Sequence, residues 1–345
     1  LGNFYLPDSS RTQVTQPKKG TFYFGEDSLG QSLYYEQVDS AQSQLAMNLT
    51  LFNNQHPQQR IKHIIPNPQR TYLLVLHQQL GSVADSATIV TKGKQQQISA
   101  LGEIYEIRWW GNETVVYAKS NGKGGAKEWS LHLPTHHTHR LYQESDSTFD
   151  LRVIRRAGQL HMLSESKSES ETWLLKGTPA SPKLDCVQKR QPNVHYQIHG
   201  SPYDWYMLSN QDAPNNQIYH TKDSLPRNWQ LIQEEKSQVY LQDLWVTPEF
   251  LITKSYEKSF PKVKYRRKNS SSWQAIELPH ALCEFSVGLA PLQPHILHLW
   301  ASGPSTPIRK ISWNMKRETS QVTYPQQLKP YHWAGYLSSK RMWAK

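Results

Sequence analysis

Cysteine is scarce in this sequence, which contains only Cys186 and Cys283. Two cysteines so far apart can form neither a disulfide framework nor a cysteine-based zinc site. A reduced compartment is the simplest expectation, and we therefore expect the protein in the cytoplasm. The periplasm stays open as an alternative, because proteins there can also lack disulfides.

Long apolar runs are missing as well. No stretch approaches the roughly 18 apolar residues that a membrane-spanning helix needs, and nothing resembles a signal peptide. We therefore expect no membrane partner. The chain begins with Leu1 rather than Met, so we expect a processed or excised piece that would have lost any signal.

Helical periodicity is almost absent, and aromatic residues are plentiful. No stretch of about ten residues repeats apolar positions at i, i+3, i+4 and i+7. The chain has 12 Trp, 18 Tyr and 8 Phe, whereas disordered chains are poor in aromatics. Together with a mean hydropathy of −0.71, this composition favours half-buried strands over thick helical cores.

Acidic residues are outnumbered, with 28 Asp and Glu against 39 Lys and Arg, and the formal net charge is +11. Such a balance favours acidic partners, including nucleic acid. A scattered basic surface is the interpretation we prefer, so we do not expect a nucleic-acid partner. In the densest basic run Lys262, Lys264 and Arg266 alternate, as the outward face of a strand would.

Short apolar runs recur in pairs, each pair joined by a turn as in a β-hairpin. The spacing between successive turns is roughly 43 to 46 residues, which is the period of four-stranded propeller blades. A seventh, weaker hairpin spans residues 21–36, with its turn near Gly30. The six clearer turns lie near Asn67, Asn112, Gly158, Ser201, Thr247 and Leu292.

Two more strand candidates follow most of these hairpins, which gives about four strands in each repeat. The sequence therefore predicts an all-β fold, a seven-bladed β-propeller of four-stranded antiparallel blades. We expect a lead-in at residues 1–19 and the blades at residues 20–335. The Ser- and Glu-rich tract at residues 164–171 looks like a linker, but the repeat assigns it to a connection inside one blade.

Catalytic and cofactor motifs are missing. The sequence has no G-x-S-x-G elbow, no Walker A motif and no G-x-G-x-x-G, and residues 121–127 are best explained as a hairpin loop. We expect no cofactor and no metal. The strongest metal candidate is a histidine cluster without an interleaved carboxylate, and solvated loop histidines are the better interpretation: His132, His136, His137 and His139.

Several short motifs resemble the propeller of the prolyl oligopeptidase family, most closely oligopeptidase B and prolyl-endopeptidase-like proteins. The family's Tyr-x-Glu-x-Asp-x-x-Phe run and its Ser-Glu-x-Trp-x-Leu run are matched by Tyr142, Glu144, Asp146, Phe149, Ser170, Glu171, Trp173 and Leu175. Weaker matches follow in the same order, at residues 208–210 with Asn215, 229–232, 302–307 and 336–345.

The resemblance implies one half of a two-part enzyme. In the family, the propeller caps an α/β-hydrolase domain with a Ser-Asp-His triad and keeps large folded proteins away from it. That hydrolase domain and peptide substrates are then the implied partners, and residues 336–345 would begin the linker toward the hydrolase. No catalytic residue is expected in this chain itself.

The resemblance also implies substrate-contacting residues. Glu144 and Asp146 match a stretch that faces the family's central cavity. Gln211 stands where proline-specific members tend to carry Arg, which argues against proline specificity. Two alternatives stay open: the carboxylates could belong to an ordinary blade connection, and the chain could be a free-standing basic propeller that binds a protein or nucleic acid.

Overall fold

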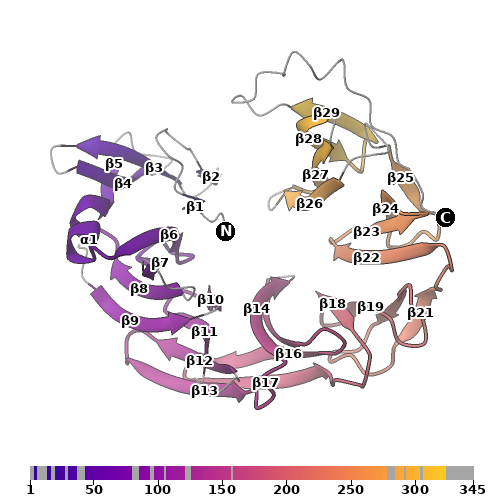
Figure 1. The fold of residues 1–345 in the computed structure, drawn as a ribbon, viewed down its shortest axis with the longest axis horizontal. Helices are drawn as coiled ribbons and strands as arrows, with labels where there is room; N and C mark the ends of the chain where they lie inside the picture. The colour runs from indigo at the N-terminus through magenta and orange to yellow at the C-terminus, as the bar shows by residue number, and fades with distance from the viewer. Residues whose placement is uncertain are drawn as a thin grey trace, which may run out of the picture. The chain divides into compact units, whose positions relative to one another are not determined.

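The fold is almost entirely β, with one short helix, α1 (Leu49–Gln55), among the residues described here (Figure 1). Within that part of the chain, no helix combines the length and apolarity needed to cross a bilayer. Of the loop expected at 121–127, residues 121–125 lie outside it, and residues 126–127 begin strand β12 (Ala126–His132) instead. The linker expected at 336–345 also lies outside it. The computed structural model describes residues 4–5, 14–16, 20–27, 30–36, 43–79, 85–93, 97–104, 106–120, 126–156, 158–277, 284–290, 293–303 and 306–323.

The described strands form seven antiparallel sheets, and nearly every strand pairs with the next one along the chain. The first sheet contains β2 (Val14–Gln16), β3 (Gly20–Asp27), β4 (Gly30–Glu36) and β5 (Ser43–Asn48). The second contains β6 (Gln59–Pro66), β7 (Tyr72–Gln79), β8 (Asp85–Thr91) and β9 (Gln97–Ile104), with β1 (Phe4–Tyr5) added beside β6. The third contains β10 (Glu106–Trp109), β11 (Thr114–Ser120), β12 (Ala126–His132) and β13 (His137–Gln143).

The remaining four sheets repeat this order. The fourth contains β14 (Asp150–Arg156), β15 (Gln159–Glu165), β16 (Ser170–Thr178) and β17 (Ser181–Gln188). The fifth contains β18 (Tyr196–Ser201), β19 (Asp204–Ser209), β20 (Gln217–Thr221) and β21 (Gln230–Gln233). The sixth contains β22 (Val239–Val246), β23 (Phe250–Glu257), β24 (Phe260–Arg267) and β25 (Gln274–Ile276), and the seventh contains β26 (Glu284–Ala290), β27 (Gln293–Gly303), β28 (Thr306–Asn314) and β29 (Thr319–Thr323).

These sheets confirm the predicted all-β propeller of four-stranded antiparallel blades. The predicted turns near Asn67, Asn112, Gly158, Ser201 and Thr247 each join the first two strands of a sheet; the turn near Leu292 itself lies outside the described residues. The weak hairpin near Gly30 is β3 with β4, the middle pair of its sheet, because β2 precedes it. The Ser- and Glu-rich tract at residues 164–171 contains the connection between β15 and β16, as predicted, but only residues 166–169 lie between the strands, and the ends of the tract belong to β15 and β16.

The burial of each strand explains how easily it can be recognised from the sequence. The second strand of a sheet is covered on both faces, so β7, β15 and β19 are buried over nearly their whole length and read as apolar runs. First strands such as β10 and β18 alternate between buried and half-buried residues. The fourth strand β13 is almost wholly accessible, so its sequence is polar.

The chain divides into two compact units, and the division runs through the fourth sheet. The first unit comprises Leu1–Arg155, Leu160–Lys167 and Trp173–Cys186, and the second comprises Arg156–Gln159, Ser168–Thr172 and Val187–Lys345. Within each unit, apolar side chains from consecutive sheets form shared cores. One joins the second and third sheets, and another joins the sixth and seventh.

Hydrogen bonds between neighbouring sheets repeat at the same period as the turns. The amide of Asn67 donates to the backbone oxygen of Asn112 at 2.7 Å, 45 residues on. The buried indole of Trp109 donates to the backbone oxygen of Ile65 at 2.9 Å, 44 residues back. Such bonds satisfy buried polar groups and hold consecutive sheets in a fixed register.

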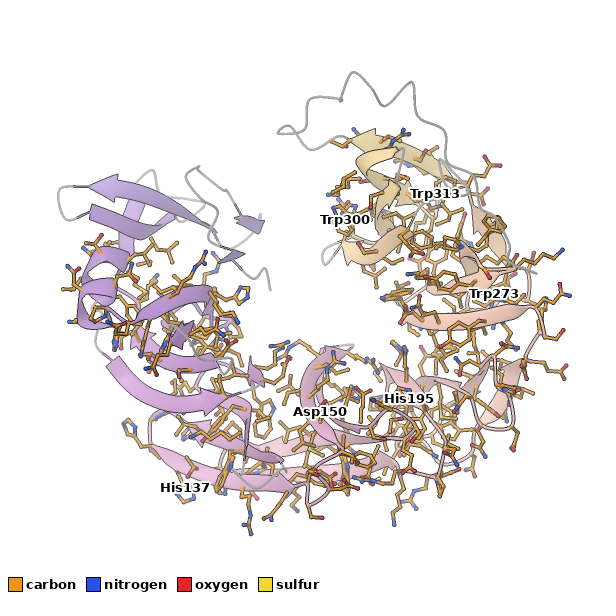
Figure 2. The ribbon with its side chains drawn as sticks, viewed as in Figure 1. His137, Asp150, His195, Trp273, Trp300 and Trp313 are labelled. Atoms are coloured by element: carbon orange, nitrogen blue, oxygen red, sulfur yellow. The ribbon has the colours of Figure 1, made fainter. Side chains whose placement is uncertain are left out.

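The predicted outward row on β24 needs one correction. Lys262 is exposed and Lys264 is half-buried, but Arg266 is only 8% exposed. Its guanidinium lies over the ring of Trp273, labelled in Figure 2, at 5.1 Å from the ring centroid, and it also donates to the backbone oxygen of Ser270 at 2.6 Å. Stacking and hydrogen bonding offset the cost of burying this charge.

Candidate functional site

Glu144 lies on the connection between β13 and β14 and is 4% exposed. Its Oε1 accepts the backbone N–H groups of Ser145 and Asp146, both at 3.1 Å. Its Oε2 accepts the hydroxyl of Ser164 at 2.7 Å and that of Tyr142 at 3.3 Å. A buried carboxylate is stable only when hydrogen-bond donors of the protein replace the water molecules that would hydrate it. Glu144 has four such donors, and through Ser164 it ties the connection to strand β15.

Asp146 has the opposite environment, since its side chain is exposed. Its Oδ1 accepts the backbone N–H of Thr148 at 2.9 Å and the Thr148 hydroxyl at 2.7 Å, which is an Asx-turn. Phe149, 7% exposed, anchors the end of this turn in the first unit. The connection therefore presents one carboxylate to solvent on a backbone that Glu144 holds in place.

Gln211 lies on the loop between β19 and β20 and is half-buried. Its N–H donates to the hydroxyl of Ser209 at 3.1 Å, and its backbone oxygen accepts from the amide of Gln217 at 3.0 Å. The side chain of Asn210 accepts the N–H of His195, labelled in Figure 2, at 2.7 Å. The Ser-Asn pair that resembled the family thus builds the loop that carries Gln211.

The structure brings two of the three predicted residues together. Glu144 and Asp146 share one hydrogen-bonded connection, whereas Gln211 belongs to the other compact unit. Glu144 and Asp146 lie on the link from a fourth strand to the next sheet, and Gln211 lies on the link from a second strand to a third.

The Ser-Glu pair of the second family motif lies at the start of β16, and Ser170 joins this strand to β18 of the next sheet. The hydroxyl of Ser170 accepts the N–H of Tyr196 at 2.8 Å and donates to the Tyr196 oxygen at 3.1 Å. Glu171 pairs with Arg190 at 3.1 Å. The sequence identified Ser170 and Glu171 but missed Arg190, along with Ser164 in the Glu144 network, because neither partner stands at a position that local pattern distinguishes.

A second charged cluster links the fifth and sixth sheets. Asp204 accepts from His220 at 3.2 Å and also pairs with Lys268, whose ammonium lies 5.2 Å from the ring centroid of Tyr206. Burial opposes ionisation of Asp204, but the hydrogen bond and the charge of Lys268 outweigh it and lower the pKa of the carboxyl. The cluster is therefore best explained as a structural ion pair between the two sheets.

The histidine cluster is spread over a hairpin. His132 ends β12, His137 and His139 lie on β13, and His136 occupies the turn between them with φ of 53°. The rings of His137 and His139 meet edge to face at 4.4 Å between centroids. Among the described residues, no group of three or more His, Cys, Asp or Glu side chains is arranged to hold a metal ion.

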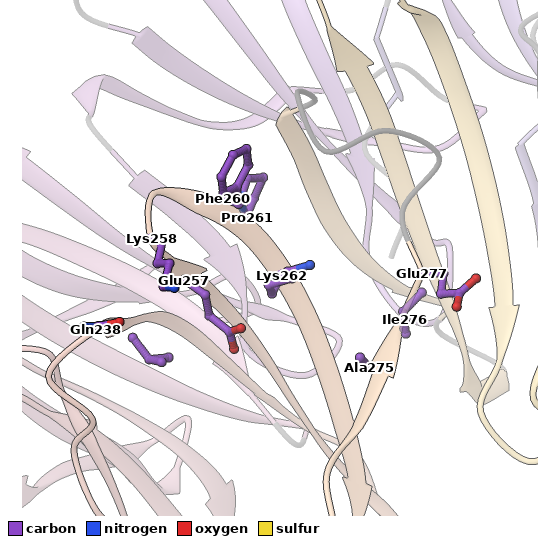
Figure 3. A pocket seen from close by; sticks show the side chains of 10 residues that line it. Gln238, Glu257, Lys258, Phe260, Pro261, Lys262, Ala275, Ile276 and Glu277 are labelled. Carbon is purple, nitrogen blue, oxygen red and sulfur yellow. The ribbon is translucent and has the colours of Figure 1, made fainter. Parts of the chain in front are cut away.

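A hollow of about 700 Å³ opens at the end of the sixth sheet (Figure 3). Val239, Phe260 and Ile276 contribute apolar lining, and Lys258 and Lys262 line it as well. None of the predicted site residues lines it. Residues 278–283, which follow its last lining residue, lie outside the described part of the chain, so we assign it no role.

Comparison with known proteins identifies the family. Residues 18–322 match the family described as the prolyl oligopeptidase N-terminal β-propeller domain. The chain belongs to this family. A chicken (Gallus gallus) protein named "Prolyl endopeptidase-like" is 23% identical over 265 residues, which cover 74% of this chain and 36% of that protein. The predicted resemblance to the prolyl oligopeptidase family is confirmed.

Solved structures show the same fold in longer proteins. Oligopeptidase B from Trypanosoma brucei, solved in a closed form with covalently bound antipain, gives a TM-score of 0.74 at 17% identity. Oligopeptidase B from Leishmania major gives 0.73 at 13% identity. The matches cover 92% and 94% of this propeller chain but 48% and 49% of theirs, so it spans about half the length of these relatives.

Proposed function

We propose that this propeller is the gating and substrate-lining domain of a serine peptidase of the prolyl oligopeptidase family. The strongest support is the family match over residues 18–322, in a chain that spans about half the length of its structural relatives. The sequence also has no G-x-S-x-G elbow, so catalysis would rest with an α/β-hydrolase domain of the same parent protein. The propeller would admit peptides and keep large folded proteins out.

Within this function, Asp146 is the carboxylate best placed to contact a peptide. The oxygens of Glu144 already accept four hydrogen bonds inside the fold, whereas the carboxylate of Asp146 is exposed. A peptide presents a cationic amino terminus and often Lys or Arg side chains, which an exposed carboxylate attracts at close range. Glu144 would then position Asp146 rather than contact substrate.

The first test asks whether this chain catalyses anything. The purified chain, incubated with fluorogenic peptides that contain Arg or Pro, should release no product. The parent protein should cleave the same peptides and be blocked by a serine-directed inhibitor. Inhibitor-sensitive turnover by the chain alone would contradict the proposal that catalysis rests with a separate hydrolase domain. A reading frame that stops after Lys345 would favour a free-standing propeller.

The second test compares two carboxylates in the parent enzyme. Asp146→Asn should raise KM several-fold for cationic peptides and leave matched neutral peptides nearly unchanged, since one partly exposed charge contact is worth on the order of 1 kcal/mol. Asn preserves an acceptor for the Asx-turn, so the loop should keep its conformation. Asp150→Asn, at an exposed position at the start of β14, is the matched control and should change neither value. Equal effects of Asp146→Asn on both peptide classes would assign it a structural role instead.

A further inference from the structure

Helix α1 lies on the connection from the first sheet to the second, and most of its side chains are accessible to solvent. Asn48 caps it, since its side-chain oxygen accepts the N–H of Leu51 at 2.7 Å. Of its seven residues only Leu49 and Phe52 are buried, in the core that the first two sheets share. A helix this short is not stable by itself, so these tertiary contacts decide whether it forms.

His77, on β7, lies beneath this helix and is 3% exposed. Its ring lies 5.8 Å from that of Phe52 and 6.0 Å from that of His56, with which it is stacked. His56 ends α1, and its backbone N–H donates to the oxygens of Phe52 and Asn53. The helix and its C-terminal cap therefore cover the imidazole of His77.

The environment of the covered imidazole disfavours its protonated, charged form. Its Nε2 bonds the hydroxyl of Thr88 at 2.9 Å, and its Nδ1 has no partner among the described residues. Among the described residues, the charged groups that act on it are His56 on α1 and Asp85 on β8, and Asp85 is paired with Lys62 of β6 at 2.7 Å. Burial first, and then the charge of His56, lower the pKa of His77 to about 4, although Asp85 acts in the opposite direction.

We propose that α1 is an acid-sensitive latch, released from the first two sheets when His77 takes up a proton. In the closed state the imidazole is buried beside His56 and stays neutral. Once α1 lifts away, water and the exposed Nδ1 allow His77 to behave as an ordinary histidine. Acid therefore favours the open state, because only that state accommodates the charge.

The size of the effect follows from proton linkage. The closed state has the lower pKa, about 4, and the open state the ordinary value of 6.5, so the closed state loses stability as pH falls from above 6.5 toward 4. Between pH 7.5 and pH 5.0 the opening equilibrium should increase roughly thirty-fold. Above pH 7.5 no further change is expected, because His77 is then neutral in both states.

Hydrogen exchange tests this latch in the intact chain. Protection factors, corrected for the intrinsic pH dependence of exchange, are measured at pH 7.5, 6.5, 5.5 and 5.0 for α1 and for β11, a buried strand that serves as the internal reference. The protection of α1 should fall about thirty-fold relative to β11. An unchanged ratio would overturn the proposal.

The matched variant is His77→Gln, whose amide can bond Thr88 but does not titrate. In this variant the ratio of protection between α1 and β11 should be independent of pH, and a ratio that follows the wild type would overturn the proposal. If His77→Gln does not fold, the native pKa of His77 in the wild-type chain decides, measured by NMR of the imidazole. A value near 4 supports the latch, and a value near 6.5 rules it out.

Discussion

Removing the carboxylate of Glu144 should destabilise the first unit strongly, because four hydrogen bonds end on it. In Glu144→Ala the hydroxyl of Ser164, itself fully buried, loses a charged acceptor at 2.7 Å. The N–H groups of Ser145 and Asp146 belong to exposed residues, so water can replace part of their loss. Hydrogen bonds to charged groups are worth about 1.5–3 kcal/mol, so we expect a net loss of about 3 kcal/mol.

Glu144→Gln should cost much less. The amide oxygen can keep both backbone donors, and the amide nitrogen can donate to the hydroxyl oxygen of Ser164, since a hydroxyl also accepts. The network then survives without its charge, and we expect a loss of about 1 kcal/mol. The assay is urea unfolding of both variants, followed by tryptophan fluorescence and circular dichroism.

Asp150→Ala is the control for this series, because it removes an exposed carboxylate six residues away and should change the unfolding free energy by less than about 0.5 kcal/mol. A loss in Glu144→Ala no larger than in this control would show that Glu144 does not stabilise the first unit. A loss in Glu144→Gln as large as in Glu144→Ala would also contradict this role, since the structure provides a polar network that the amide can complete.

Three further outcomes are expected. Gly200→Ala should cost about 3 kcal/mol or more, because Gly200 has φ of +103° and an added Cβ would lie 2.1 Å from the backbone oxygen of Asp204; the thermal midpoint measures it. Ser170→Ala should cost about 1–3 kcal/mol in urea unfolding, because the buried N–H and oxygen of Tyr196 both lose the Ser170 hydroxyl. Lys268→Gln should lower the urea midpoint near pH 7, and the difference from wild type should shrink progressively as pH falls below 3.8, because the lowered pKa of Asp204 gives stability above its unfolded value of 3.8 that is lost as pH falls through the folded value.

The sequence predicted the blades because burial leaves a local pattern in them. The second strands are covered on both faces, so residues such as Leu73, Leu74 and Val75 follow one another without a polar interruption. Turn residues then mark the ends of each run, and the repeat of about 45 residues fixes which runs belong together. Strand β9 was harder to recognise, because QISALGEI alternates too weakly to stand out.

Long-range partners account for what the sequence could not predict. A carboxylate such as Glu144 is usually exposed, and its burial depends on Ser164, which lies 20 residues further along the chain. Arg266 was expected on an outward face because its neighbours alternate, but Trp273 offers it a stacking partner. Helix α1 is only seven residues long, too short for helical periodicity to register.

The central proposal is that this propeller controls access to a serine peptidase domain of the same parent protein. The most direct measurement uses the intact parent with one cleavable sequence, presented as a short peptide and as an insertion in a loop of a stably folded protein. We expect inhibitor-sensitive cleavage of the peptide and no cleavage of the folded protein. Cleavage of both at comparable kcat/KM would contradict the gating role, and an inert parent would contradict the peptidase function itself.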